Sequence, residues 1–355
     1  MSFSIDSIST MDITVTNDIL DTSLFSYIAS EGFSNTDWNK IPDTLLVYLF
    51  LHDEPTIGKR RKLSTKKEYL RDLQNFFQFY KYSIREVKTA DLLAYQLYLE
   101  ERNIAPTSLR RASSVIKQFF SYLYKQGVIE NQVTLKMKRV AQPLDQLVNR
   151  DIYNDEVQQL LDYFQNNDWF AYTLLVLLSS TGLRIDELAS AKWANLFSFK
   201  HKGKEFYFLK VIGKGDKPRD ALIYHDVLDV LIELRKRRSQ TIQIDPLDTS
   251  AFFCKSNGKH YSSSYLSSEF TKLIYNTNFP FVISRKDKIT PHTLRHYRVA
   301  VLSDEGIDIR SIQDAMGHAS IQTTEKYLLR KRKLETHAGI AFGNNYFNKS
   351  KDQLI

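Results

Sequence analysis

Residues 290–327 read TPHTLRHYRVAVLSDEGIDIRSIQDAMGHASIQTTEKY, and the placement of proline and glycine in this stretch predicts three successive helices. Thr290 can cap the first helix, and Pro291 occupies its first turn, where a backbone N–H would lack a helical partner anyway. Gly306 ends that helix and Gly317 ends the next, because glycine readily adopts the left-handed conformation that closes a helix. The stretch therefore indicates a helical domain.

Polar side chains gather along these predicted helices. His292, Arg295 and His296 share one face of the first helix, because residues three and four apart are neighbours on a helix. His318 follows the glycine that ends the second helix, and Tyr327 lies nine residues later, in the third. The spacing of His292 and His296 also suits a zinc pair, but no third ligand is evident in the sequence. These residues are candidates for a chemical site.

Two motifs upstream carry further polar residues. The segment TGLRIDEL at residues 181–188 places Arg184 three residues before Glu187, a spacing that by itself most often marks a surface ion pair. Residues 205–224 have strand character on both sides of a Gly-Lys214-Gly turn, whose glycines can take the positive φ of a hairpin. By itself such a turn is usually only a hairpin, so neither motif alone establishes a function.

The whole chain is expected to be mainly α with a small antiparallel β-sheet. It has 355 residues with only 12 Gly and 8 Pro, a composition that suits long helices better than many tight turns. An acidic N-terminal arm at 1–36, a helical domain at 37–135, a linker at 136–150, a second domain at 151–335 and a tail at 336–355 are predicted. In the first domain, an aromatic stripe recurs at helical spacing and is expected to be core. Its residues are Tyr69, Leu70, Leu73, Phe76, Phe77 and Tyr80.

Charge is distributed unevenly along the chain. The net charge is +8, yet residues 1–54 hold nine acids and one base, whereas residues 55–139 hold 18 Lys/Arg and 7 Asp/Glu. A modest excess usually means only solvated helix faces, but its concentration in one segment favours a nucleic-acid partner. Arg110 and Lys117 fall on one strip of a predicted helix, opposite its apolar face. The full set of candidate phosphate contacts is Lys59, Arg60, Arg61, Lys66, Arg110, Arg111, Lys117, Lys138 and Arg139.

The motifs together resemble the tyrosine recombinases, the phage-integrase and Xer-type site-specific DNA recombinases. The resemblance rests on TGLR-x-x-EL, the Gly-Lys-Gly turn, H-x-x-R, MGH and the final tyrosine, in that order and spacing. It implies a core DNA-binding domain at 37–135 and a catalytic domain at 151–335, arranged as a C-shaped clamp on DNA. The catalytic residues that it implies are Arg184, Lys214, His292, Arg295, His318 and Tyr327, with Glu187 and His296 supporting them.

The resemblance also implies a chemistry that these residue types suit. Planar guanidinium groups can hold the charge that builds on a phosphate during displacement, and a tyrosine oxygen is both a nucleophile and a workable leaving group. Strands would be cut and rejoined through a 3′-phosphotyrosine at Tyr327, with Lys214 as general acid and either His292 or His318 as base. Because the phosphotyrosyl bond conserves the energy of the broken linkage, no ATP, metal or cofactor is expected.

The expected partners are a double-stranded DNA recombination site and further copies of the chain, as a tetramer on two sites. Residues 336–355 would dock on a neighbouring subunit. The implied role is integration or excision of a mobile element, or resolution of replicon or transposon dimers. Two alternatives remain: a noncatalytic helix-turn-helix regulator formed by residues 309–329, and a type IB topoisomerase, which shares the chemistry without synapsis.

Composition supports a cytoplasmic protein that does not enter a membrane. The longest apolar run, near residues 174–178, falls far short of the ~20 residues needed to span a bilayer. The single cysteine, Cys254, excludes an intramolecular disulfide framework, as expected in a reducing compartment.

Overall fold

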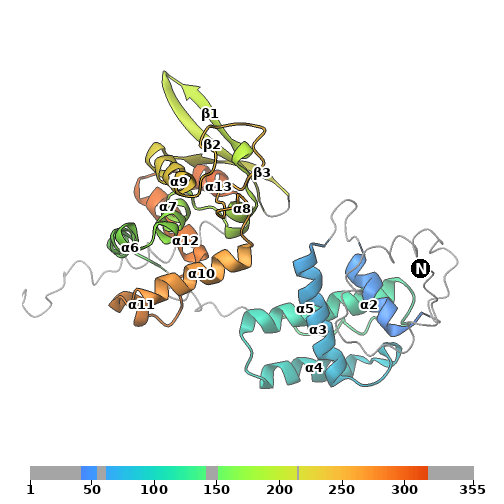
Figure 1. Ribbon diagram of the computed structural model, residues 1–355. Helices are drawn as coiled ribbons and strands as arrows, with labels where there is room; N and C mark the ends of the chain where they lie inside the picture. Colours follow the sequence, from blue (N-terminus) through green and yellow to red (C-terminus); the bar gives the residue numbers. More distant parts are fainter. Residues whose placement is uncertain (1–40, 54–60, 141–150, 214–215, 319–355) are drawn as a thin grey trace, which may run out of the picture. The chain divides into compact units, whose positions relative to one another are not determined.

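The computed structural model describes residues 41–53, 61–140, 151–213 and 216–318 (Figure 1). The chain divides into two compact units, Met1–Leu144 and Asp145–Ile355. Several predictions lie outside the described residues: those for the arm at 1–36, the tail at 336–355, Lys59, Arg60, Lys214 and Tyr327. Within the described ranges, no helix is long and apolar enough to cross a membrane.

The first unit is helical and holds its own apolar core. Its elements are α2 (Asp43–His52), α3 (Leu63–Phe79), η5 (Ile84–Glu86), α4 (Thr89–Glu101) and α5 (Pro106–Lys125). Helix α3 packs against both α2 and α5. Leu70, Leu73 and Phe76 are buried along α3, and the Phe76 ring lies 5.4 Å from the Phe120 ring of α5, centroid to centroid. The predicted stripe on this helix is therefore core, as expected.

The second unit combines a helical bundle with a three-stranded antiparallel sheet at one edge (Figure 1). This confirms the predicted fold class. Its helices are α6 (Asn154–Asn167), α7 (Trp169–Thr181), α8 (Ile185–Ser190), η6 (Trp193–Asn195), α9 (His225–Arg237), α10 (Ser263–Asn276), α11 (Pro280–Ile283), α12 (Pro291–Asp304) and α13 (Ile309–Met316). Its strands are β1 (Leu196–His201), β2 (Lys204–Ile212) and β3 (Pro218–Ile223), paired in the order β1-β2-β3.

The sheet contains one strand that the sequence pattern did not predict. Strand β1 pairs with β2 from Leu196 opposite Leu209 onward, and β2 pairs with β3 as the expected hairpin around the Gly-Lys-Gly turn. Only Leu196 of β1 is buried, and Phe197 and Phe199 are exposed, so the strand has no buried apolar face. Its place is set by pairing along the backbone.

Helix α7 lies at the centre of the second unit and carries the chain to Arg184. It contacts α6, α9, α10, α12 and β3, and its leucines are buried on several sides, as in a helix surrounded by others. The helix ends at Gly182, which has φ +62°. A Cβ at this position would lie 2.7 Å from Met316 Sδ, so glycine also allows α13 to approach. Arg184 is thereby placed beside the end of α13.

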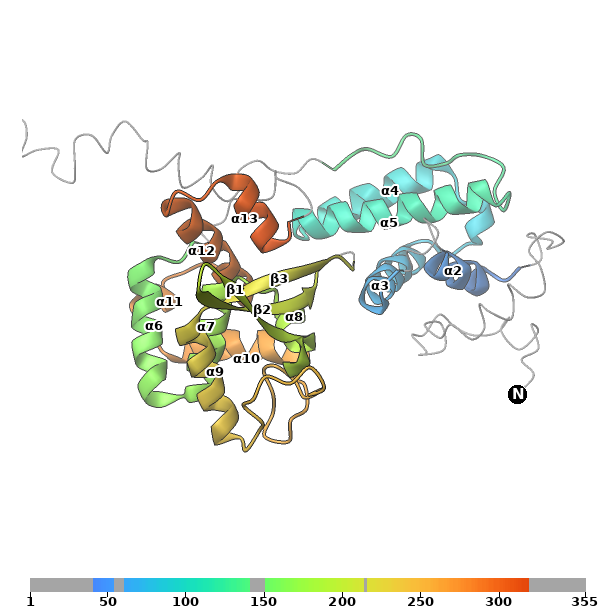
Figure 2. The ribbon, with the colours of Figure 1, turned by 90° about the horizontal axis from the view of Figure 1, so that it is seen from above.

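The two helices predicted from residues 290–317 form with the expected ends. Thr290 and Pro291 begin α12, and the Asp308 side chain caps α13 by accepting hydrogen bonds from Arg310 N and Ser311 N, both at 3.0 Å. Helix α13 ends at Gly317, with φ +62°. Helix α13 contacts both α12 and β3 (Figure 2), so it lies between the preceding helix and the sheet.

Candidate active site

A buried carboxylate, Glu187, lies at the centre of the candidate site. It is 2% exposed and sits in the first turn of α8. Its Oε1 lies 2.7 Å from Arg184 Nη1, and its Oε2 lies 2.6 Å from Arg219 Nη2. Oε2 also accepts a hydrogen bond from Arg184 N at 2.8 Å. The carboxylate therefore holds two guanidinium groups together.

These hydrogen bonds determine the charge state of Glu187. Burial alone would raise its pKa, but hydrogen bonding and charge from Arg219, followed by hydrogen bonds from Arg184, lower the pKa below its ordinary value. Glu187 thus remains ionised in a buried position because two cations face it. The ion pair of Arg184 with Glu187 therefore belongs to this buried network and is not the surface pair that its spacing alone would indicate.

The buried Arg295 joins two helix ends. Only 2% of Arg295 is exposed; Nη1 donates to Gly182 O at 2.5 Å, and Nη2 donates to Met316 O. Arg184 Nη2 donates to Gly317 O at 3.0 Å. The two arginines predicted to bind phosphate lie at the same end of α13.

His318 lies at this same place, and its surroundings keep it neutral. It is 8% exposed, and its backbone N donates to Gln313 O at 3.0 Å as α13 ends. Burial lowers the pKa of His318 to about 4, aided in turn by the positive charges of Arg295, Arg184 and Arg219, and by His292. A neutral imidazole can accept a proton or a hydrogen bond at physiological pH, which a charged one cannot do.

The other predicted residues lie around this cluster. His292 is exposed in the first turn of α12, and its ring packs edge-on against His296 at 4.5 Å between centroids. Lys214 lies outside the described residues, but the preceding Gly213 is buried against the site. A Cβ at Gly213 would lie 3.4 Å from Glu187 Oε1 and 3.6 Å from Arg184 Nη1. The hairpin therefore reaches the arginine cluster immediately before the lysine.

Sequence reasoning missed Arg219, which the structure places in the cluster. It lies on β3, and its Nη1 donates to Ala315 O at 2.7 Å in addition to its bonds with Glu187. Arg219 pairs across the hairpin with Val211, which is 3% exposed. Paired residues in an antiparallel sheet lie on the same face, so the hairpin register places Arg219 on the buried face. The hairpin register was therefore the signal that could have identified Arg219 as a member of the cluster.

In the first unit, three of the predicted DNA contacts are engaged within the unit. Lys66 is 7% exposed, with its Nζ 2.9 Å from His52 Nδ1. Arg61 donates to Phe50 O at 2.5 Å and to Asp53 O at 2.8 Å, at the end of α2. Arg111 is held by the buried Asp72 at 2.8 and 3.1 Å. These three side chains thus bind groups of their own unit, and their contact with phosphate stays a prediction.

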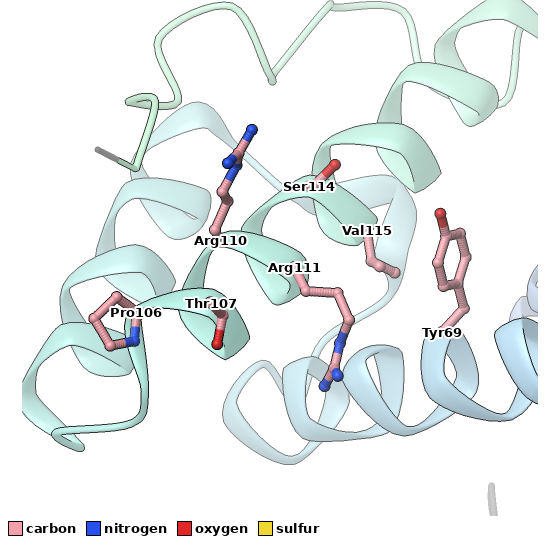
Figure 3. A pocket seen from close by; sticks show the side chains of 7 residues that line it. All are labelled: Tyr69, Pro106, Thr107, Arg110, Arg111, Ser114 and Val115. Carbon is pink, nitrogen blue, oxygen red and sulfur yellow. The ribbon is translucent and has the colours of Figure 1, made fainter. Parts of the chain in front are cut away.

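The other four predicted contacts that lie among the described residues are on the surface. Arg110 and Lys117 are exposed along α5, and Lys138 and Arg139 are exposed after it. Figure 3 shows Arg110 pointing away from α3 while Arg111, the next residue, extends toward α3, around a pocket that Tyr69 also lines. Of these two neighbouring arginines on α5, one thus faces solvent and the other faces Asp72 of α3.

Comparisons with known proteins give family matches in both units of the chain. The model of the phage integrase family matches residues 150–333, and that of the phage integrase N-terminal SAM-like domain matches residues 55–130. Tyrosine recombinase XerC of Rickettsia peacockii (strain Rustic) is 27% identical over 277 residues, which cover 73% of this chain and 84% of that protein. XerC of Rickettsia bellii (strain OSU 85-389) is 27% identical over 302 residues, covering 80% and 93%.

Solved structures show the same fold. The XerH site-specific recombinase in a post-cleavage complex with palindromic difH substrate superposes with a TM-score of 0.63 at 21% identity, covering 78% of this chain and 80% of that one. A lambda integrase dimer bound to a COC′ core site superposes with a TM-score of 0.58 at 17% identity, covering 76% and 90%.

The pKa of His318 is open to direct measurement. We expect its imidazole in the folded protein to titrate near pH 4, because burial and the guanidinium groups of Arg295, Arg184 and Arg219, together with His292, disfavour the cation. Histidine-selective ¹⁵N NMR, assigned with a His318→Asn variant, measures this midpoint. In urea-unfolded protein the same residue should titrate near its ordinary value of about 6.5.

The linked effect on stability has a defined sign. Because the folded-state pKa is lowered, the unfolded chain binds the extra proton first. The contribution of His318 to stability is complete above about pH 6.5 and is lost as the pH falls toward about 4. A folded-state midpoint at or above 6.5 would show that the cluster does not surround His318.

Proposed function

The chain belongs to the phage integrase family, the tyrosine recombinases, and from this membership we propose that its Arg184–Arg295–His318 cluster binds the scissile phosphate of a DNA recombination site. The observation that carries the proposal is convergence. The end of α13 is surrounded by Arg184, Arg295 and His318. Gly213, the residue that precedes Lys214, lies beside Arg184. Such a cluster of cations beside a neutral imidazole suits an anion that gains charge during reaction.

The proposed step is a transesterification at phosphorus. The Tyr327 oxygen forms a bond to the phosphorus while the bond from phosphorus to the 5′ oxygen breaks, leaving a 3′-phosphotyrosine. Lys214 donates a proton to the departing 5′ oxygen, and His318 or His292 accepts the proton of the tyrosine. Attack of a partner strand's 5′ hydroxyl reverses the step and releases Tyr327. The number of phosphoester bonds is unchanged, so the reaction needs no ATP.

The charge balance of the site supports this role. Two guanidinium groups, from Arg184 and Arg219, face the carboxylate of Glu187, and Arg295 adds a third positive charge beside His318. These described groups together carry an excess of positive charge. Guanidinium groups hold phosphate oxygens through paired hydrogen bonds and remain charged at all relevant pH values. Together with Lys214 they provide the stabilisation that a metal ion supplies in other phosphoryl-transfer enzymes, so we propose a reaction without metal or cofactor.

We further propose that the exposed face of α5 contacts the DNA backbone. Arg110 and Lys117 lie seven residues apart on this helix and are both exposed. Lys138 and Arg139 extend the basic surface beyond the helix. Contacts of this type position a protein on the duplex and make its affinity depend on salt.

We place the reaction in the cytoplasm, on a tetramer that holds two DNA sites. The tail at 336–355, outside the described residues, would dock on a neighbouring subunit and close the ring. Two roles fit this chemistry: integration or excision of a mobile element, and resolution of replicon or transposon dimers. The family match and the XerC relatives favour a recombinase over the helix-turn-helix regulator and the type IB topoisomerase.

The nucleophile can be tested by trapping. A nicked suicide site, from which the 5′ fragment diffuses away after cleavage, should accumulate a covalent protein–DNA adduct with the wild-type chain. Tyr327→Phe should form none while binding the site with unchanged affinity, because only the phenolic oxygen is lost. Denaturing gel electrophoresis measures the adduct, and peptide mapping locates it. An adduct that persists in Tyr327→Phe refutes the nucleophile, and no adduct with wild type supports a noncatalytic DNA-binding protein.

The α5 face can be tested by the salt dependence of DNA binding. Arg110→Ala should weaken binding and reduce the slope of log K against log salt by about 1, because one phosphate contact is lost. Arg111→Ala is the matched control, because that arginine is held by Asp72. The control should lower the melting temperature and leave the slope unchanged. An unchanged slope in Arg110→Ala would remove this residue from the DNA surface.

A further inference from the structure

Three successive carbonyl groups at the C-terminal end of α13 each accept a hydrogen bond from a different arginine. Arg219 Nη1 donates to Ala315 O at 2.7 Å, Arg295 Nη2 donates to Met316 O, and Arg184 Nη2 donates to Gly317 O at 3.0 Å. The last carbonyls of a helix lack helical partners and carry the negative end of its dipole, so they suit guanidinium groups. The three arginines come from different elements and meet at one helix end.

The Arg219 side chain makes two further bonds to Glu187. Its Nη2 lies 2.6 Å from Oε2 and its Nε lies 3.5 Å from Oε1, and its side chain is 8% exposed. It is the foremost of the groups that keep the pKa of Glu187 low, ahead of Arg184. Arg219 therefore compensates much of the negative charge of Glu187, so that less of that charge has to be compensated by Arg184.

The contact between Arg219 and α13 is close enough to require a glycine. A Cβ at Gly317 would lie 2.6 Å from Arg219 Cδ, which is closer than side-chain carbons approach. Gly306 also has positive φ, at +75°, but nothing lies within 4 Å of its added Cβ. Both glycines thus have a left-handed backbone conformation, but of the two only Gly317 lies against Arg219.

Arg219 also links two parts of the chain that carry functional groups. It lies five residues after Lys214, on the strand that leaves the hairpin, and it holds the helix end that precedes His318. Its guanidinium is thus a direct connection from the hairpin to the end of α13. A shift of either element would change hydrogen bonds of the other.

We propose that Arg219 is a positioning residue for strand cleavage, which fixes the end of α13 and the Glu187 carboxylate so that Arg184 and His318 face one phosphate. It acts through these groups and not by touching the DNA. The catalytic part of this inference rests on the proposed function; the structural part does not.

The structural part is tested by amide hydrogen exchange of the free full-length chain. Arg219→Gln should raise exchange at the amides of Gly317 and His318 by about tenfold or more, because the loss of a charge-assisted bond loosens the helix end. Arg285→Gln is the matched control. Arg285 is also nearly buried and also joins a glutamate, Glu156 at 2.5 Å, to backbone carbonyls. It should leave exchange at 317 and 318 unchanged.

The catalytic part is tested with the suicide site and a binding assay. Arg219→Gln should slow adduct formation by about tenfold or more while DNA affinity stays within about threefold, because the loss is of alignment and not of DNA contact. Arg285→Gln should match wild type in both measurements. Arg219→Lys should recover only part of the rate, because one ammonium group cannot span Glu187 and Ala315 O as the guanidinium fork does.

A second pair of variants approaches the same contact from α13. Gly317→Ala should slow adduct formation in the same way, because the new methyl group displaces Arg219. Gly306→Ala carries comparable backbone strain without the clash and should cleave at the wild-type rate.

The inference is overturned if Arg219→Gln leaves exchange at 317 and 318 at the wild-type level, or if Arg219→Lys recovers the full cleavage rate, since charge alone would then suffice. Equal slowing in Gly306→Ala and Gly317→Ala would also overturn it. If the wild-type chain forms no adduct at all, the proposed function fails, and the exchange measurement still decides whether Arg219 holds the helix end.

Discussion

The structure of the second unit depends on the charge of one buried carboxylate. Glu187 is almost fully removed from solvent, and an ionised group in that position is tolerated only with charged hydrogen-bonding partners. Arg184 and Arg219 supply them from the start of α8 and from β3. Because each guanidinium also binds a carbonyl at the end of α13, the carboxylate joins a short helix, a strand edge and a helix C-terminus. Removing the carboxylate would leave two guanidinium groups close together without the negative charge that they share.

This arrangement brings together several polar groups from the ends of elements. Arg184 precedes α8, Gly213 follows β2, and His318 follows α13. Left-handed glycines at 182 and 317 let those ends approach one another. Burial, and then the concentration of positive charge, keep His318 neutral although a histidine at a helix C-terminus is ordinarily favoured as a cation. The same charge that suits a phosphate therefore contributes to the protonation state of its neighbour.

Local signals in the sequence predicted what depends on local chemistry. Thr290, Pro291, Asp308 and Gly317 set helix ends by short-range capping, and the structure has those ends. The role of Arg219 could not be seen this way, because it depends on the hairpin register and on Glu187, 32 residues away. The partners that the basic residues of the first unit have within that unit could not be seen for a related reason. A charge count does not reveal that Arg111 pairs with Asp72, 39 residues earlier, or that Lys66 is buried against His52. Strand β1 was missed because its place is set by backbone pairing with β2 and not by a buried apolar face.

The central claim is that Arg184 and Arg295, at the end of α13, face a single DNA phosphate. The most direct measurement is a crystal structure of the full-length chain, with Tyr327 changed to phenylalanine, bound to an uncleaved cognate site. Nonbridging oxygens of one phosphate should lie within hydrogen-bonding distance, about 2.7–3.2 Å, of both Arg184 and Arg295, with Glu187 still between Arg184 and Arg219. A bound site whose phosphates all lie beyond hydrogen-bonding reach of these guanidinium groups would contradict the account.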